Sequence, residues 1–164
     1  MKATAIPITA IKDPVLFLAL GFGTGLARFA PGTFGTLAAV PIYWSMQSLS
    51  VFYYSLITLV LFIVGIYLCH SAALKLGVHD HPGIVWDEIV GYLITMFLAP
   101  AGITWIIVGF ALFRLFDIWK PWPIAWLDAK VHGGMGIMID DVLAGIYAAV
   151  VLQLTVLLLP FLGL

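Results

Sequence analysis

Apolar residues dominate six stretches of the chain, and short polar stretches separate them. The third and sixth stretches are long enough to cross a lipid bilayer as helices. The fourth and fifth are shorter than the roughly 17 to 25 residues that a spanning helix needs. We expect those two to tilt less, to enter the bilayer only part-way or to extend into the polar flanks. The six stretches are Val15–Ala27, Phe34–Leu49, Phe52–Leu74, Ile84–Leu98, Ile103–Phe116 and Asp141–Phe161.

The first stretch contains three glycines between Gly21 and Gly25, so we expect it to bend or break. The connections near Leu49–Phe52 and Ala99–Ile103 carry no Asp, Glu, Lys or Arg. If the second and third stretches form one hairpin and the fourth and fifth another, every charged region opens on the same side. Lys and Arg mark that side as cytoplasmic. The first stretch must then begin and end there, as a re-entrant or interfacial segment.

Composition narrows the class of protein further. Hydrophobic residues make up 63% of the 164 residues and charged residues only 9%, which is too little to cover a water-soluble surface. We predict an all-α, polytopic membrane helix bundle with polar loops on the cytoplasmic side, in one domain covering residues 1–164. The formal net charge of −1, without a basic stripe, argues against a nucleic-acid partner. The single Cys69 excludes an intramolecular disulfide.

Two adjacent carboxylates, Asp140 and Asp141, stand where a glycine-rich stretch meets the last apolar stretch. We expect that glycine-rich stretch, Gly133–Ile139, to be a flexible loop, with the acids at the mouth of the following helix. Carboxylates are costly near hydrocarbon, so they indicate a functional site that faces protein or a wet cavity. The alternative is a helix cap, because carboxylates suit the free N–H groups of a first turn.

Other polar stretches converge on the same predicted face, and they carry the oxygen ligands that Mg²⁺ prefers. Magnesium takes only a few carboxylates and leaves water and phosphate to complete its shell. Adjacent acids on a helix point about 100° apart, so one member of a pair can bind metal while the other holds a neighbouring group. The candidate ligands, among which the sequence gives no preference, are Asp87, Glu88, Asp117, Asp140 and Asp141.

Cationic side chains accompany these acids. Arg114, Asp117 and Lys120 recur every three residues, so they lie along one side of a helix. Arg114 or Lys120 can hold phosphate oxygens, as a fork or as a point charge respectively. The alternative is an ordinary ion-pair ladder at a helix end.

Glycines and histidines complete the set of candidates. Glycines allow backbone N–H groups to form an anion-binding nest, although they also serve close helix packing in membranes. The glycines in question are Gly32, Gly133, Gly134 and Gly136. His79 and His81 flank Asp80 and can transfer protons or bind metal, and the alternative for both is a solvated loop histidine.

Two phosphatase chemistries are disfavoured. Cys69 lies inside an apolar stretch and has Lys75, not Arg, six residues on, so a thiolate phosphatase loop is not supported. No Asp-x-Asp pair follows a strand-like run, which argues against a phospho-aspartate enzyme of the soluble haloacid type. Metal-activated water is the simplest nucleophile that remains.

Five motifs follow one another in the region from about Gly21 to about Gly145. They are Ala30-Pro31-Gly32-Thr33, Val78-His79-Asp80-His81, Trp86-Asp87-Glu88, Phe116-Asp117-x-x-Lys120-Pro121-x-Pro123 and Gly133-Gly134-Met135-Gly136-Ile137-Met138-Ile139-Asp140-Asp141-x-x-Ala144-Gly145. In this order they closely resemble the phosphatidylglycerophosphatase A family of bacterial inner membranes. The resemblance implies Mg²⁺-dependent hydrolysis of phosphatidylglycerophosphate to phosphatidylglycerol and phosphate, a step of phospholipid biosynthesis, on the cytoplasmic side of the inner membrane.

The resemblance also implies roles for particular residues. Catalytic or metal-binding roles fall to the five acids named above, with His79 and Asp80 as further catalytic candidates. The candidates for contacts with the substrate or its phosphate are Gly32, Thr33, Gly134, Arg114 and Lys120. The family often has Pro shortly before the Ala-Pro-Gly-Thr turn, where this chain has Arg28, which adds a candidate phosphate contact.

Two rival functions remain open. A small ion or proton transporter would need polar groups across the bilayer, and the third and sixth stretches offer few, chiefly His70 and Gln153. A different Mg²⁺-dependent head-group enzyme, a transferase, would carry an Asp-Gly pair followed by further Asp residues at four-residue steps, which this chain lacks.

Overall fold

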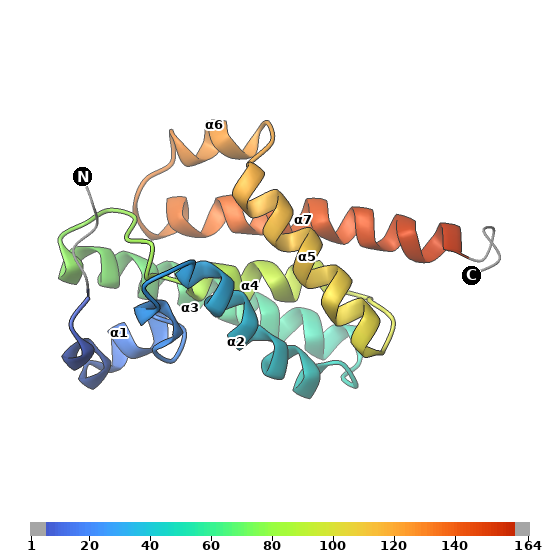
Figure 1. Cartoon of the computed structure of the whole chain (residues 1–164), viewed down its shortest axis with the longest axis horizontal. Coiled ribbons are helices and arrows are strands. Elements are labelled where there is room, and N and C mark those ends of the chain that lie inside the picture. The colour runs from blue at the N-terminus through green and yellow to red at the C-terminus, as the bar shows by residue number, and fades with distance from the viewer. Residues whose placement is uncertain (1–5, 160–164) are drawn as a thin grey trace.

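The computed structural model describes residues 6–159, and every regular element within that range is a helix (Figure 1). This confirms the predicted all-α class. The elements in chain order are η1 (Ile8–Lys12), α1 (Pro14–Ala19), η2 (Thr24–Leu26), α2 (Pro31–Met46), α3 (Val51–Leu76), α4 (Trp86–Thr95), α5 (Ile103–Trp119), α6 (Ile124–Asp128) and α7 (Gly133–Leu158).

Two helices, α3 and α7, have 26 residues each and are long and apolar enough to cross a membrane. One face of α3 exposes large apolar side chains such as Phe52, Leu59 and Ile63. This pattern is typical of a helix that faces lipid rather than water. The predicted division into one domain over residues 1–164 stays a prediction.

The first apolar stretch breaks, as predicted from its glycines. Helix α1 ends at Ala19, and the next residues turn with positive φ at Gly21 and Gly23. The turn packs against the start of α4, because the Val85 N–H donates a hydrogen bond of 2.9 Å to the Ala19 carbonyl oxygen. Gly21 also faces the Val85 side chain so closely that a Cβ there would lie 2.7 Å from it.

The expected flexible loop before Asp140 and Asp141 is wrong, because α7 already begins at Gly133. A side chain on Gly134 would collide with the Ile66 carbonyl oxygen of α3. The absence of a side chain therefore lets the two long helices pack closely, and this tertiary contact outweighs the low helix propensity of glycine. The two acids consequently lie inside the helix, so the helix-cap alternative does not hold.

Helix α4 is short and occupies the centre of the fold, where it packs against α2, α3, α5 and α7. Its side chains Ile89, Val90, Tyr92 and Leu93 are fully buried. The approach to α7 is close, because a Cβ on Gly145 would lie 2.5 Å from the α4 carbonyl oxygen of Gly91. This close packing sets the distance between acids on the two helices.

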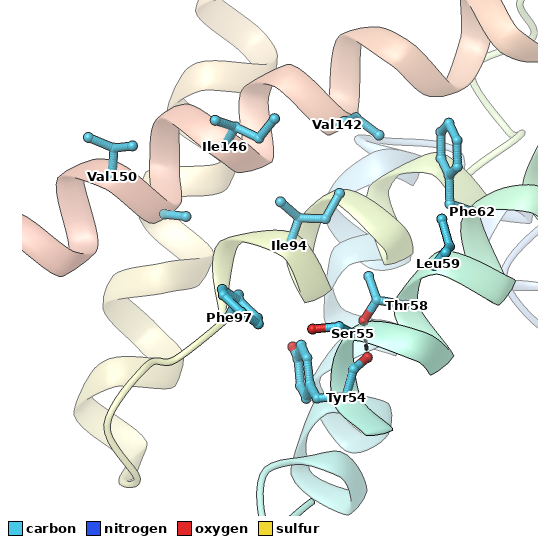
Figure 2. Close-up of a pocket in the computed structure, with 11 residues that line it drawn as sticks. Tyr54, Ser55, Thr58, Leu59, Phe62, Ile94, Phe97, Val142, Ile146 and Val150 are labelled. Atoms are coloured by element: carbon cyan, nitrogen blue, oxygen red, sulfur yellow. Dashed lines mark hydrogen bonds between the residues drawn. The ribbon is translucent and has the colours of Figure 1, made fainter. Parts of the chain in front are cut away.

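An apolar groove of about 490 Å³ opens between α3, α4 and α7 (Figure 2). It extends to the C-terminal end of α4, where Phe97 lines it and α3 begins nearby, while α7 runs on past that point. Two of the hydroxyl groups that line it form local hydrogen bonds. Tyr54 donates to the Leu93 carbonyl oxygen at 2.7 Å, and Thr58 donates to the Tyr54 carbonyl oxygen at 2.9 Å.

Candidate active site

A polar pocket of about 260 Å³ lies where the N-termini of α2 and α4 and the C-terminus of α5 meet α7. Six carboxylates and two cationic side chains line it, so the predicted convergence of the polar stretches is confirmed. The lining residues are Ala30, Pro31, Gly32, Asp80, Pro82, Ile84, Asp87, Glu88, Arg114, Asp117, Ile118, Lys120, Asp140 and Asp141. Their chemical roles stay predictions.

Asp87 and Glu88 occupy the first turn of α4. Carboxylates suit this position because the free N–H groups and the helix dipole favour negative charge there. The preceding Trp86 is buried and anchors the turn, since its indole N–H donates to the Leu61 carbonyl oxygen of α3 at 3.1 Å. The start of α4, which carries both acids, is therefore anchored to α3.

Three of the five predicted ligands form one compact group. Asp87, Glu88 and Asp141 each offer an oxygen within 4.8 Å of the others. Asp87 and Asp141 are buried, with 8% and 3% of their surface exposed. Among the described residues, Asp87 Oδ1 and Glu88 Oε2 are buried and have no hydrogen-bond partner. Buried carboxylates this close repel one another, so the group requires a bound cation or protons.

The two other predicted ligands are engaged by cations. Asp117 forms an ion pair with Arg114 one turn before it on α5, and the same guanidinium lies 3.8 Å from Glu88 Oε1. Asp140 accepts from the Lys120 ammonium at 2.6 Å. Asp140 and Asp141 therefore have different surroundings, whereas Asp87 and Glu88 both belong to the group of three. Which member of each pair binds metal stays a prediction.

Lys120 has a second partner, Asp128 of α6, at 3.0 Å. Lys120 ends α5 in the left-handed region, with φ 45°, and the chain turns there toward α6. Burial disfavours the charged ammonium, but Asp140 and Asp128 outweigh this effect and raise the pKa of Lys120. The two carboxylates therefore favour the charged form of Lys120 at the pocket. Asp128 was not among the site residues predicted from the sequence, where its only signal was its position eight residues after Lys120.

The N-terminus of α2 forms another wall of the pocket. Ala30 adopts a left-handed conformation with φ 46°, Pro31 begins the helix, and Gly32 is buried. A Cβ on Gly32 would collide with Glu88 Oε1 and lie 2.9 Å from Arg114 Nη1. Only glycine lets α2 approach these two side chains so closely. The neighbouring Thr33 is partly buried and is not one of the lining residues.

The side chains of Asp80 and His79 lie in different surroundings, although the two residues are adjacent in the chain. Asp80 lies exposed at the pocket, where partial desolvation by the surrounding protein raises the pKa of its carboxyl and Lys120 opposes the shift. His79 instead accepts a hydrogen bond from the Gly133 N–H at 2.7 Å and packs edge-on against His132. His79 therefore holds the beginning of α7.

The predicted contacts Arg28 and Gly134 also lie outside the pocket lining. Arg28 is exposed, and Gly134 packs against α3.

Comparison with known proteins agrees with a pocket suited to a phosphate ester. The family model for phosphatidylglycerophosphatase A matches residues 17–156. Phosphatidylglycerophosphatase A of Escherichia coli strain K12 is 49% identical over 143 residues, covering 87% of this chain and 83% of the relative. The protein of the same name from Haemophilus influenzae is 47% identical over 144 residues, covering 87% of this chain and 88% of the relative.

A third relative has a different name. A protein of Bacteroides thetaiotaomicron, provisionally named a phosphatidylinositol-3-phosphatase, is 36% identical over 147 residues, with 85% of this chain and 91% of the relative covered. No solved structure matches the chain. The matching family model covers most of the chain, as do the two relatives that share its name. The chain therefore belongs to the phosphatidylglycerophosphatase A family of phosphatase enzymes.

Proposed function

We propose that this protein hydrolyses the terminal phosphomonoester of phosphatidylglycerophosphate to give phosphatidylglycerol and inorganic phosphate. The observation that carries the proposal is the group formed by Asp87, Glu88 and Asp141, which lies in one pocket with Arg114 and Lys120. Carboxylates that can hold a divalent metal beside two cations match the needs of a phosphate ester. The substrate follows from the names of the two relatives at 49% and 47% identity.

We propose Mg²⁺ as the cofactor and Asp87, Glu88 and Asp141 as its protein ligands. These residues fit the ion because they are hard oxygen donors, close together, and the described part of the chain leaves Asp87 Oδ1 and Glu88 Oε2 without partners. The pocket also has more carboxylates than cations, which favours binding of a divalent cation. When bound, magnesium supplies positive charge that activates water and neutralises phosphate oxygens.

The chain's own groups bind and orient the phosphate in this scheme. Arg114 Nε, which has no hydrogen-bond partner among residues 6–159, is available to a phosphate oxygen. Asp117 pairs with the guanidinium and keeps its plane fixed. Lys120 adds a point charge, and Gly32 keeps the wall of α2 thin enough for the ester to approach Glu88. In this scheme Asp117 holds Arg114 and Asp140 holds Lys120. The group of three binds the metal.

The substrate's acyl chains would remain in a bilayer that α3 and α7 cross. Both helices have the length and composition for it, and the C-terminal part of α3 lies against the start of α7, since Gly134 touches His70. Lys75 and Lys130 then lie on one side, which we infer to be the cytoplasmic side of the inner membrane. Asp141 follows Gly133 by eight residues, about 12 Å along the helix, so the pocket is sunk below the helix ends.

Phosphate release from purified protein in lipid–detergent micelles tests the proposal. Phosphatidylglycerophosphate should be hydrolysed in the presence of Mg²⁺ and not in excess EDTA. Phosphatidylinositol 3-phosphate and phosphatidic acid, presented in the same micelles, should be poorer substrates. A clear preference for phosphatidylinositol 3-phosphate would replace the proposed substrate with the one in the third relative's name. A lack of any phosphate release would contradict the assignment as a lipid phosphatase.

A further inference from the structure

The Lys120 ammonium lies between two carboxylates that come from different helices. Asp140 of α7 accepts from it at 2.6 Å, and Asp128 of α6 accepts at 3.0 Å. The two acids differ in environment, because the Asp140 side chain is 9% exposed and the Asp128 side chain 40%. Asp140 belongs to the pocket lining, whereas Asp128 approaches the ammonium from outside it.

An ammonium group has three N–H donors and no acceptor. One hydrogen bond to Asp140 would leave the group free to rotate about that contact. A second bond, to Asp128, removes this freedom and fixes the direction of the remaining N–H. Because Lys120 lines the pocket together with Arg114, the remaining donor is available to an oxygen bound there.

The backbone explains how Asp128 reaches this position. The chain turns at Lys120 in a left-handed conformation, runs through Pro121–Pro123 and enters the short helix α6. Helix α6 is anchored by the fully buried Ile124 and packs on α7. The last residue of α6 is Asp128, so its carboxylate returns to the side chain at which the turn began.

From this arrangement we propose that Asp128 is a positioning residue: it orients the Lys120 ammonium so that one N–H points at the phosphate of the substrate. The proposal rests on the proposed function, since it concerns phosphate binding at the same site. The competing explanation is an ordinary ion pair on the surface, which would contribute little to stability and nothing to turnover.

Asp128→Asn tests the proposal because it keeps the size of the side chain and removes its charge. We expect kcat/KM for phosphatidylglycerophosphate to fall about tenfold or more, the loss typical of a weakened hydrogen bond to a charged group. The thermal midpoint should change little. Asp128→Glu should recover part of the activity because it restores a carboxylate that can reach the ammonium.

Asp13→Asn is the matched control. Asp13 also forms a partly exposed ion pair with a lysine, Lys75, and its amide counterpart can still cap α1 at Val15. Asp13 lies outside the pocket lining, so this variant should retain wild-type kinetics. An equal loss in both variants would show that any lost ion pair slows the enzyme, and would overturn the proposal.

A double-mutant cycle separates positioning from a direct effect of Asp128. In a Lys120→Met background, Asp128→Asn should change kcat/KM less than twofold, because no ammonium remains to be oriented. A further tenfold loss in that background, or wild-type kinetics for the single variant, would contradict the proposal.

Binding of inorganic phosphate in the presence of Mg²⁺ provides a readout that does not depend on the lipid. Asp128→Asn should weaken phosphate binding by about the same factor as it lowers kcat/KM. If the wild-type protein binds phosphate but does not hydrolyse phosphatidylglycerophosphate, the proposed substrate fails. The positioning role is then still decided by the phosphate affinity of Asp128→Asn, and an unchanged affinity would overturn it.

Discussion

Gly32→Ala adds one methyl group at the tightest point of the site. The new Cβ would collide with Glu88 Oε1 and lie 2.9 Å from Arg114 Nη1 and 3.2 Å from Glu88 Cδ. The Glu88 carboxylate would have to withdraw by roughly 1 Å to restore van der Waals distance. A displacement of about 1 Å in a catalytic group can reduce the rate by a factor of about 100.

Stability should respond differently from activity. Gly32 lies within α2, and replacing a helical glycine by alanine favours the helix by about 0.5–1 kcal/mol. The clash involves the ends of two flexible side chains, which can move without unfolding the protein. We therefore predict that Gly32→Ala folds with a near-native thermal midpoint and loses about a hundredfold in kcat.

Ser45→Ala is the control for this prediction, since Ser45 is an exposed residue near the other end of α2 and lies outside the pocket lining. Both variants would be assayed by phosphate release from phosphatidylglycerophosphate and by thermal unfolding in the same micelles. A folded Gly32→Ala variant with wild-type turnover would refute the placement of Glu88 at the reacting centre.

Three further predictions concern the metal group, the cysteine and the topology. Asp87→Asn and Asp141→Asn should each reduce turnover about a hundredfold or more and weaken Mg²⁺ binding measured by titration, whereas near-native rates in both would make the acidic group structural. Cys69→Ser should remain active, because the thiol is fully buried against Met138 and away from the pocket lining; loss of activity in a folded variant would reopen a thiolate mechanism. In that cysteine-free background, a cysteine in the turn near Leu49–Phe52 should react with a membrane-impermeant thiol reagent from outside, and one at Lys130 only after the membrane is opened. The reverse labelling would overturn the orientation inferred from the lysines.

Hydropathy predicted the existence and approximate extent of the longer helices, α2, α3, α4, α5 and α7, but not of α6. Long apolar stretches have few other structures available in this composition. The beginning of α7 could not be predicted in this way. Gly133–Gly136 has low helix propensity, and its helical structure depends on the contact between Gly134 and α3, which is distant in sequence. The break after Ala19, by contrast, was predictable because the three nearby glycines act locally.

The acids of the pocket were also predictable as a set, since charges in so apolar a chain are concentrated in a few polar stretches. The sequence did not predict how these acids divide: three form one group, and Asp117 and Asp140 pair with cations. That division depends on the rotation of α4, α5 and α7 about their axes, which the packing of Gly91 and Gly145 determines. Asp128 was missed for a related reason, because its contact with Lys120 depends on the path of the chain through α6.

The decisive experiment measures how phosphatidylglycerophosphate hydrolysis depends on free Mg²⁺ in the wild type and in Glu88→Gln. The wild-type rate should rise from near zero in chelator to a plateau as Mg²⁺ is added. Glu88→Gln should require a much higher Mg²⁺ concentration and reach a lower plateau, because it lacks one charged ligand of the proposed site. Full wild-type activity in excess chelator, with protein shown to be metal-free by elemental analysis, would contradict the account, and so would identical Mg²⁺ curves for the two proteins.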